Sequence, residues 1–211
     1  METFSSFVGH YPVRNFKKGE IIVCQGMVPR GCYVVRSGFV KVFLTTKDGE
    51  EKSLGFDSIH DLLPLTWIFG RTKSAIYYYQ AFTDCEAYEI PRGDLVHYLY
   101  TQPELFHKLF EKVLDLNIDL LQHIQSLEQA KASDKLLYAF SFLVRRFGKR
   151  VTQSRVRMLL PLTQQDLANF LGLTRETTGT QLKALQHKGI ISYRHQQYIV
   201  HTDRLRLLLG D

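Results

Sequence analysis

The stretch LTQQDLANFLGLTRETTGTQLK, residues 162–183, carries the pattern that decides the fold of the C-terminal part of this chain. Its first half places apolar residues on one helical stripe, at Leu162, Leu167, Phe170 and Leu171. Gly172 follows where a tight turn needs a positive φ. Thr174 then stands where a side chain can cap a second helix. Helix, glycine turn and helix in this order predict a helix-turn-helix.

The two helix starts carry further signals. Thr163 precedes the first helical turn, and Asp166 three residues later adds an acidic group near the positive helix end. Arg175 and Glu176 occupy the first turn of the second helix, where a helix docked in a major groove presents base-reading groups. An ordinary helical hairpin would show the same pattern, so the flanking sequence has to decide between the two.

The segment after the second helix predicts a wing. His187-Lys188-Gly189 places a cation near the negative helix end and a glycine just beyond it. IISY (190–193) and YIV (198–200) are predicted strands on either side of Arg194-His195-Gln196-Gln197. A β-hairpin with a basic, polar turn makes the unit a winged helix-turn-helix.

The positive charge of the chain is confined to the same region. The whole chain is +6. Residues 1–132 hold 14 Lys and Arg against 16 Asp and Glu, whereas residues 133–211 hold 13 against 5. A positive field restricted to one domain is what a DNA phosphate backbone attracts. A basic surface kept for solubility is the alternative, but the excess coincides with the motif.

Composition otherwise indicates a globular protein of one large or two small domains, with 211 residues and 45% hydrophobic content. The start METFSSFVGHYPVRNF lacks the basic and apolar segments of a secretion signal, and no window is apolar enough to span a membrane. Cys24, Cys32 and Cys85 are odd in number and form no CxxC pair, which argues against a disulfide framework and an iron–sulfur cluster. We expect a cytoplasmic protein with core or half-buried thiols; redox sensing is the alternative.

The N-terminal half predicts a β-roll or barrel. Short runs rich in β-branched and aromatic residues are separated by turn signals such as Ser37-Gly38 and Lys47-Asp48-Gly49-Glu50. The expected strands cover residues 20–26, 32–38, 39–46, 51–56, 75–82 and 85–90.

A helical period begins after Pro91. We expect a short helix over 91–102 and a long one from Glu104 to about Lys131, with a coiled-coil-like seam toward a second subunit. The seam residues that define this dimer helix are Phe106, Phe110, Val113, Asn117, Leu120, Ile124 and Leu127, with Lys131 at its end. A second apolar face, toward the β-roll, comprises Leu105, Leu109, Leu116 and Leu121. A core helix within a single chain is the alternative.

The hinge between the two parts is placed at about 131–134. Ser133-Asp134 can cap a helix over 134–148, and residues 149–161 are predicted to form a loop and the first strand before the helix-turn-helix. The resulting domains are residues 1–103, a β-roll sensor domain, residues 104–132, the dimerisation helix and hinge, and residues 133–211, the winged helix-turn-helix.

This order resembles the cyclic-AMP receptor protein and fumarate–nitrate regulator superfamily of bacterial transcription factors. The sharpest match is TRETTGTQLKALQHKGIIS (174–192), because the recognition helix of the cyclic-AMP receptor branch begins S/T-R-E-T-V-G-R. FKKGEIIVCQG (16–26) and SGFVKVFLTTKDGEE (37–51) resemble the family's β-roll turns. The resemblance implies an α+β fold: a jelly roll like that of cyclic-nucleotide-binding domains, a dimerisation helix and a winged helix-turn-helix.

The resemblance also implies which residues contact DNA. By its chemistry Arg175 can pair with guanine and Glu176 can accept from cytosine, and the family would use both in a TGTGA-like half-site. Thr180 stands where that branch has a second base-reading arginine, so the half-site should be looser at that base. Residues at the family's phosphate-contacting positions are Thr163, Gln165, Thr174, Thr177 and Arg194. Lys183 and Lys188 are expected to be solvated charges.

The resemblance fails where a cyclic nucleotide would bind. Family members that bind one carry a cassette like FGELAL followed by R-S or R-A, whereas this chain has HDLLPLTWIFGRTKSAIYYY (60–79). The Gly-Glu pair is missing, Pro64 removes an amide donor, and Lys73-Ser74 supply only part of the donor set. We expect an effector pocket that is self-filled or takes a largely apolar ligand, formed by Asp61, Leu63, Trp67, Lys73, Ser74 and Tyr77, with Phe69 and Tyr79 nearby.

The sequence offers little support for a cofactor or for an enzyme. The cysteine cluster of the oxygen-sensing branch is absent, and haem ligation through His60, Cys85 or His123 has no local support. An enzyme of the metal-dependent cupin kind is not expected, because the histidines are scattered and form no HxH pair. We predict a homodimeric, sequence-specific DNA-binding regulator with RNA polymerase as a candidate partner. The alternative is an effector-binding or protein-docking module whose winged helix contacts a protein.

Overall fold

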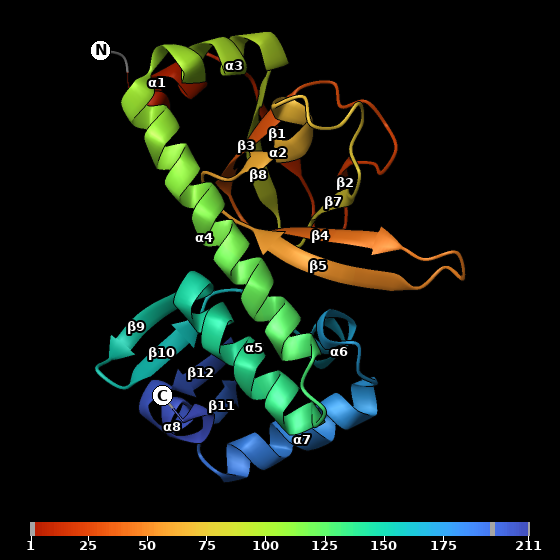
Figure 1. Ribbon diagram of the computed structural model, residues 1–211, viewed down its shortest axis with the longest axis vertical. Coiled ribbons are helices and arrows are strands. Elements are labelled where there is room, and N and C mark those ends of the chain that lie inside the picture. Colours follow the sequence, from red (N-terminus) through yellow and green to blue (C-terminus); the bar gives the residue numbers. More distant parts are fainter. Residues whose placement is uncertain (1–2, 195–196, 211) are drawn as a thin grey trace. The chain divides into compact units, whose positions relative to one another are not determined.

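The structure is a computed structural model that describes residues 3–194 and 197–210 (Figure 1). Contacts within the chain divide it into two compact units, Met1–Val113 and Leu114–Asp211. The first unit is built on two β-sheets and the second on helices around one β-sheet, so the α+β class predicted from the sequence is confirmed.

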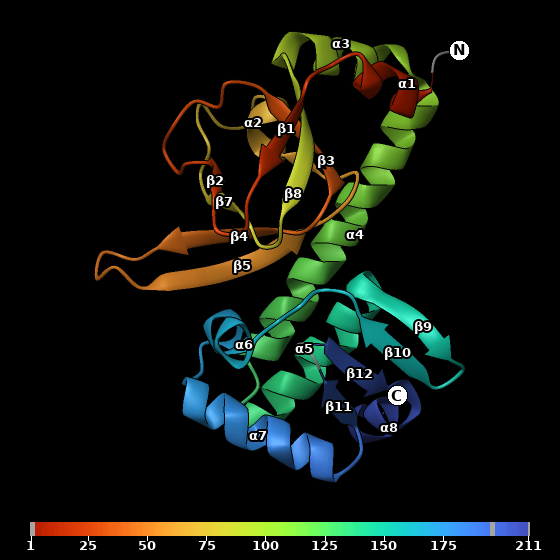
Figure 2. The same ribbon diagram turned by 180° about the vertical axis from the view of Figure 1, so that it is seen from behind.

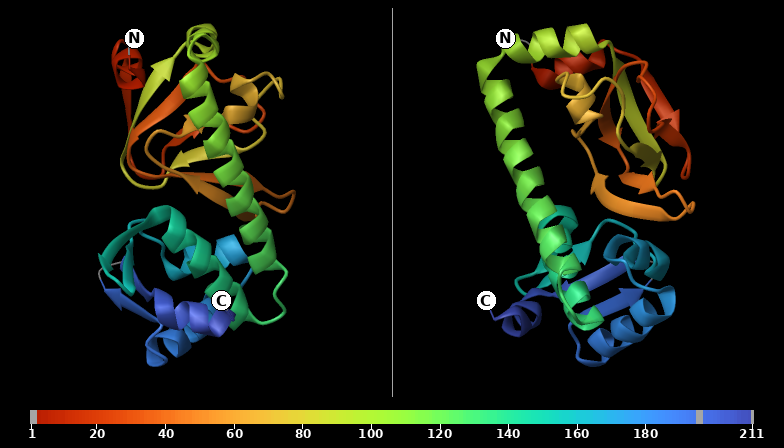
Figure 3. Two further views of the ribbon diagram at one scale, coloured as in Figure 1. Left: turned by 60° about the vertical axis from the view of Figure 1, so that its left-hand side comes forward. Right: turned by 45° about the vertical axis from the view of Figure 1, so that its right-hand side comes forward.

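The first unit contains two four-stranded sheets, with strand orders β1-β8-β3-β6 and β2-β7-β4-β5 (Figures 1 and 3). The strands are β1 (Val13–Phe16), β2 (Ile21–Val23), β3 (Cys32–Ser37), β4 (Val40–Thr45), β5 (Glu51–Asp57), β6 (Leu62–Leu63), β7 (Tyr78–Ala81) and β8 (Cys85–Ile90). Gly49 turns β4 into β5 with φ +81°, as the Asp-Gly signal predicts. The short strands β1 and β6 were not among the expected strands, because four and two residues leave too little pattern to detect.

The first sheet is buried on both faces, and this explains the continuous apolar run in β3. Cys32 and Val34 enter one core cluster, whereas Tyr33 and Val35 enter a second. Alternate residues of a strand face opposite sides, so each side chain of this run has a core to enter. Helices α1 (Phe4–Gly9), α2 (Leu65–Ile68) and α3 (Arg92–Thr101) contribute buried residues to the first cluster; α3 matches the predicted short helix.

The long helix α4 (Pro103–Leu127) has 25 residues. Leu105 and Leu109 pack against the first core cluster, as expected for the face toward the β-roll. Leu121 belongs to the second unit and is 57% exposed there, so its predicted place on that face stays a prediction. The large apolar side chains that α4 leaves exposed are Phe106, Phe110, Leu114, Ile118, Leu120, Leu121 and Ile124.

The second unit contains helices α5 (Ala132–Phe147), α6 (Gln164–Leu171), α7 (Arg175–His187) and α8 (Thr202–Leu209). Its sheet has the order β11-β12-β10-β9, in which β9 (Gly148–Thr152) and β10 (Arg155–Met158) form one hairpin, and β11 (Ile191–Arg194) and β12 (Gln197–His201) another (Figure 2). The core joins α5 to the sheet, where the Phe140 ring meets that of Tyr198 edge to face at 5.2 Å.

Two local predictions in this unit need correction. Residues 149–161 contain two strands rather than one, because β9 pairs with β10 across a short turn. The helix α5 begins at Ala132 with Lys131 as its N-cap residue and no side-chain cap bond, whereas Ser133 donates to Asp134 inside the first turn. The helix begins earlier than the capping signal suggests because the Lys131 carbonyl accepts from the Asp134 and Lys135 amides, each at 3.0 Å.

Candidate nucleic-acid interface

Helix α6 begins at a reciprocal cap. The Thr163 hydroxyl accepts from the Asp166 amide at 3.2 Å, and the Asp166 carboxylate accepts from the Thr163 amide at 2.8 Å. Two amides that the first turn would otherwise leave without partners are thereby satisfied. The apolar stripe read from the sequence is buried, with Leu162, Leu167 and Leu171 fully inaccessible to solvent.

A left-handed residue ends α6 and starts the turn. Gly172 has φ +62° and ψ +37°, and its amide donates to the Ala168 carbonyl. The chain then re-enters a helix at Thr174, whose hydroxyl accepts from the Thr177 amide at 3.1 Å. These contacts confirm the helix, glycine turn and helix predicted from residues 162–183.

The two helices approach closely at a glycine. A Cβ atom added to Gly179 of α7 would lie 3.0 Å from the side-chain oxygen of Gln164, at the start of α6. Thr178, beside it, is fully buried and donates from its hydroxyl to the Thr174 carbonyl at 2.9 Å. The small residues of TTG (177–179) therefore set the packing of α7 on α6.

The opposite face of α7 is left to solvent. Arg175, Glu176, Thr180 and Lys183 are exposed, whereas Thr178, Gly179, Leu182 and Leu185 are buried. Helical spacing brings the three predicted base-reading residues, Arg175, Glu176 and Thr180, onto the N-terminal part of one exposed face. Neither Arg175 nor Glu176 forms an ion pair with another described residue, so both side chains can reach an external partner.

The predicted phosphate-contacting residues lie at the starts of α6 and α7. The hydroxyls of Thr163 and Thr174 serve as caps, and Thr174 also donates to the Thr177 hydroxyl at 2.8 Å. Exposed Gln165 donates from its side chain to Asn169 at 2.8 Å. The Arg194 side chain lies outside the described part of the chain, so its predicted contact stays a prediction.

Helix α6 is held against α4 by His123, one of the three histidine and cysteine side chains considered above as haem ligands. The imidazole stacks on the Phe170 ring, with centroids 3.8 Å apart and an interplanar angle of 9°. Its Nε2 donates to the Phe170 carbonyl at 2.8 Å, since a carbonyl can only accept. A histidine among the polar positions of a predicted amphipathic helix gives no signal of this contact.

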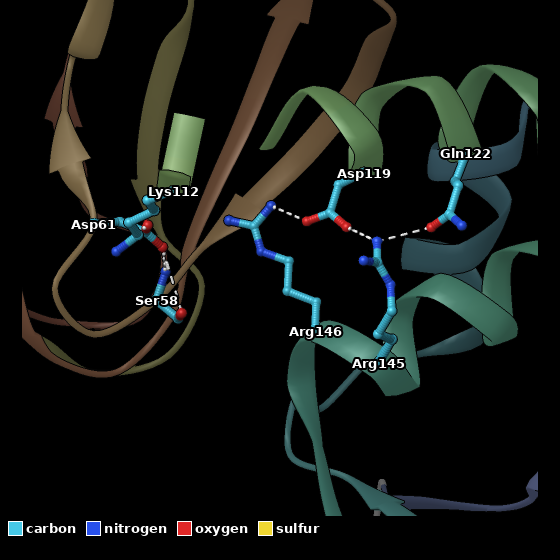
Figure 4. Close-up of polar contacts among 7 residues, drawn as sticks. All are labelled: Ser58, Asp61, Lys112, Asp119, Gln122, Arg145 and Arg146. Carbon is cyan, nitrogen blue, oxygen red and sulfur yellow. Dashed lines mark hydrogen bonds and ion pairs between the residues drawn. The ribbon is translucent and has the colours of Figure 1, made fainter. Parts of the chain in front are cut away.

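A second contact joins α4 to α5. Asp119, only 8% exposed, accepts from Arg145 and from Arg146, the latter at 2.9 Å, and Arg145 also donates to Gln122 at 2.8 Å (Figure 4). Burial raises the pKa of Asp119, while Arg146 and Arg145 act in the opposite direction. Arg145 and Arg146 of α5 therefore balance the negative charge of the desolvated Asp119 carboxylate.

In the first unit, the predicted effector residue Asp61 is buried and paired. Its carboxylate lies 2.8 Å from the Lys112 Nζ of α4 and accepts from the Ser58 amide at 2.6 Å (Figure 4). Lys112 also donates to the His60 carbonyl at 2.8 Å. This pair could not be predicted from the sequence, because Asp61 and Lys112 are 51 positions apart.

The remaining pocket candidates are not gathered at one site. Leu63 lies in the second core cluster with Tyr77 packed against it, whereas Trp67 lies in the first cluster. Lys73 is exposed and Ser74 is half-buried. Tyr77 and Tyr79 pack into the same cluster, as strand alternation predicts. The aromatic side chains thus fill the cores of the β-roll.

These residues do not fit a cyclic phosphate. An anion of that kind needs several converging donors. The stretch instead offers the buried carboxylate of Asp61, whose cationic neighbour Lys112 is already bound to it, followed by two core leucines. A cavity of about 430 Å³ lies elsewhere in this unit, between β1 and β2, and its lining includes Arg14, Arg30, Tyr33 and Glu89 but none of the six candidates.

The haem candidates are engaged in structural contacts or exposed. Cys85 is buried and donates to the Phe39 carbonyl at 3.0 Å, His123 is stacked on Phe170, and His60 is exposed. The three cysteines are free thiols. Within residues 3–194 and 197–210, no three His, Cys, Asp or Glu side chains gather as a metal site. Of the helices in that part of the chain, none is both long and apolar enough to cross a membrane.

Two family models match this chain. Residues 13–101 match the cyclic nucleotide-binding domain, and residues 139–208 match the Crp-like helix-turn-helix domain. The first covers the strands of the β-roll, and the second begins within α5 and runs into α8.

Similar proteins extend the match over most of the chain. Electron transport regulator A of Shewanella oneidensis is 28% identical over 92% of this chain and 77% of its own length. The fumarate and nitrate reduction regulatory protein of Salmonella typhimurium has the same values, and the transcriptional activator protein FnrL of Cereibacter sphaeroides is 26% identical over 92% and 78%.

Solved structures show the same fold. FixK2 from Bradyrhizobium japonicum superposes with a TM-score of 0.77 at 21% identity, over 94% of this chain and 96% of that one. A CooA mutant from Carboxydothermus hydrogenoformans gives a TM-score of 0.75 at 20% identity, over 99% and 92%.

Proposed function

Because this chain belongs to the Crp/Fnr superfamily of transcription regulators, we propose that it acts as a homodimer that binds a pseudo-palindromic DNA site through Arg175 and Glu176. Thr180 reads a further base with a shorter reach than arginine. Thr163, Gln165, Thr174, Thr177 and Arg194 contact phosphates and fix the register.

The observation that carries this proposal is the exposed start of α7. Arg175 and Glu176 stand side by side in its first turn, without an ion-pair partner among the described residues. Beneath them, Gly179 and Thr178 hold the helix against α6. A rigid helix that presents an arginine and a carboxylate to solvent has the groups needed for guanine and cytosine edges.

The proposed dimer rests on the exposed face of α4. Of the predicted seam, Phe106, Phe110, Leu120 and Ile124 are between 37% and 54% exposed, Asn117 is exposed, and Val113 and Leu127 are half-buried. Contiguous exposed apolar surface of this kind marks an interaction site. A second copy of the same helix would cover it, with Asn117 fixing the register.

The effector of this regulator is proposed to be something other than a cyclic nucleotide. The pairing of the buried Asp61 carboxylate with Lys112 and the leucines that follow Asp61 support this, because they stand where a cyclic phosphate needs donors. RNA polymerase is a proposed partner, and the cytoplasm, where thiols stay reduced, is the proposed location. If the winged helix bound a protein instead, the exposed Arg175-Glu176 pair would have no base edge to read.

The test is to enrich a random-sequence duplex pool with the wild-type protein and compare variants on the enriched site. Arg175→Ala should weaken specific binding by about 1–3 kcal/mol and relax the preference at one guanine. Lys183→Ala, exposed two turns further along α7, is the matched control and should leave that preference intact. Equal loss on enriched and random DNA for Arg175→Ala, or no enrichment at all, would refute the proposal.

A further inference from the structure

The hairpin of β9 and β10 is strongly basic. Its sequence GKRVTQSRVRM (148–158) contains four cations and no carboxylate. The hairpin forms the edge of the second unit's sheet farthest from β11 (Figure 2). From the sequence, residues 149–161 are predicted to form only a loop and a strand before the helix-turn-helix.

Strand register shows which of these cations share a face. Lys149 lies opposite Arg157, Arg157 lies opposite Ile199, and Arg155 lies opposite His201. Directly opposed residues of antiparallel strands point to the same side of a sheet, and so do residues two apart on one strand. Lys149, Arg155 and Arg157 therefore occupy one face, here called the basic face.

The other face of the sheet is the core. Val156 lies opposite Val200, which is fully buried, as is Met158. Arg150 lies opposite Val156, so it belongs to that side, although it is exposed at the sheet edge. The β-bulge between Arg155 and Val156 falls on β9, at the extra residue Val151, and leaves the alternation of β10 intact.

The three cations of the basic face are exposed, and none of them forms an ion pair with another described residue. Lys149 and Arg157 are directly opposed like charges, an arrangement that destabilises a sheet. His201, on the same face, is close to the Asp203 carboxylate of α8, but it is also close to the cations Arg155 and Arg204. This face therefore keeps an uncompensated positive charge that an external polyanion would stabilise.

We propose that the basic face binds the phosphate backbone of the DNA duplex that flanks the half-site read by α7. This proposal rests on the proposed function, because the basic face can reach flanking DNA only if the second unit already binds the duplex through α7. Lys149 and Arg157 lie toward the end of the sheet where β12 begins at Gln197, which is the end of the predicted wing. Lys149 and Arg157 lie on neighbouring strands about 4.8 Å apart, and Arg155 lies two residues from Arg157 on β10, so the three cations are close enough together to meet neighbouring phosphates of one DNA strand.

Phosphate is the ligand that this chemistry favours over an acidic protein. Protein interfaces depend on a large side chain, often aromatic, that the partner buries. The basic face has no exposed aromatic side chain of this kind among its residues Lys149, Arg155, Arg157, Ile199 and His201. The same row of cations matches the phosphate backbone of DNA, a uniform line of negative charge whose binding depends on the positions of the cations and not on the shape of a pocket. The face should therefore add affinity without sequence preference.

The experiment compares two duplexes that share the site enriched by the wild-type protein. The short duplex ends at the outermost selected base pair, and the long one continues for about one helical turn on each side with a fixed, unselected sequence. The variants are the triple replacement K149Q/R155Q/R157Q and, as a matched control from the other face of the same hairpin, Arg150→Gln. Circular dichroism and thermal unfolding establish that each variant is folded.

We expect wild type and Arg150→Gln to bind the long duplex about tenfold or more tightly than the short one at low salt. The long duplex should also show a steeper salt dependence, by about 0.9 in the log–log slope for each phosphate neutralised, or up to about 3 for each protomer. The triple variant should bind the short duplex like wild type and gain less than about twofold from the flanks.

Two results would overturn the inference while leaving the proposed function intact. One is a wild-type protein that binds both duplexes equally. The other is a triple variant that keeps the full gain from the flanks, since the flanking contact would then lie elsewhere. A wild-type protein that enriches no duplex at all would instead refute the proposed function.

Discussion

The contact between α4 and the helix-turn-helix leads to a prediction whose magnitude follows from the structure. His123 is 6% exposed, its ring stacks on Phe170, and its Nε2 donates to the Phe170 carbonyl at 2.8 Å. His123→Ala leaves this carbonyl without its imidazole donor near the end of α6, where helix carbonyls lack partners within the helix. We expect weaker attachment of α6 and, through it, of the base-reading helix α7.

Two terms set the expected cost. Losing a buried hydrogen bond costs about 0.5–1.5 kcal/mol. Losing an aromatic stack removes about 0.5–1.5 kcal/mol beyond the area it buries. Together they predict that His123→Ala destabilises this contact by about 1–3 kcal/mol, which is a large part of the stability of a small domain.

Native-state hydrogen exchange of the α6 amides is the suitable assay, because it reports the opening free energy of that helix without assuming a single unfolding transition. His123→Gln can restore the hydrogen bond and His123→Phe the stack, so each should recover part of the loss. His107→Ala, whose side chain is 71% exposed on the same helix, is the control. A change below about 0.5 kcal/mol for His123→Ala, the range typical of surface substitutions, would refute the reasoning.

Three other predictions follow. Leu120→Asp would bury a charge in the proposed α4 seam, so sedimentation should shift toward monomer and DNA binding should weaken; Leu207→Asp, at an 81% exposed position, should do neither. His201 has a pKa lowered by burial and then by Arg155 and Arg204, so its unfolded form binds more protons below about pH 6.5. Its contribution to stability should therefore be present above that pH and be lost as the pH falls toward the folded pKa, and in an NMR titration Arg155→Gln should raise this pKa. Calorimetry with cyclic AMP and cyclic GMP should show no saturable binding below about a millimolar, an affinity of only ~4 kcal/mol; a micromolar Kd for either nucleotide would contradict the proposed effector class.

The elements of the winged helix-turn-helix could be predicted because their causes are local. Caps at Thr163 and Thr174 and the left-handed Gly172 act within four residues of themselves, so the sequence shows them directly. The same holds for the Asp-Gly turn between β4 and β5. The exposed position of Arg175 and Glu176 follows from helical spacing once the buried stripe of α7 is known.

Contacts between distant residues could not be predicted, and they decide the proposed effector region. Asp61 is predicted to line a pocket, but its carboxylate pairs with Lys112, which folding brings to it from α4. Leu63 and Trp67 are four residues apart, yet they enter different core clusters because a sheet buried on both faces separates them. The pattern of apolar residues in the sequence cannot show whether these side chains fill two separate cores or line one pocket.

The sequence alone therefore determined the order of β-roll, long helix and winged helix-turn-helix and the candidate base-reading residues, since propensity, caps and turns depend on near neighbours. It did not show the short elements α1, α2, α8, β1, β6 and β9. Only the tertiary structure decided that His123 holds α6 and that Lys149, Arg155 and Arg157 share one face. The reason is physical: the face on which a strand residue stands depends on the register with its partner strands, and a single shift of that register would reverse it.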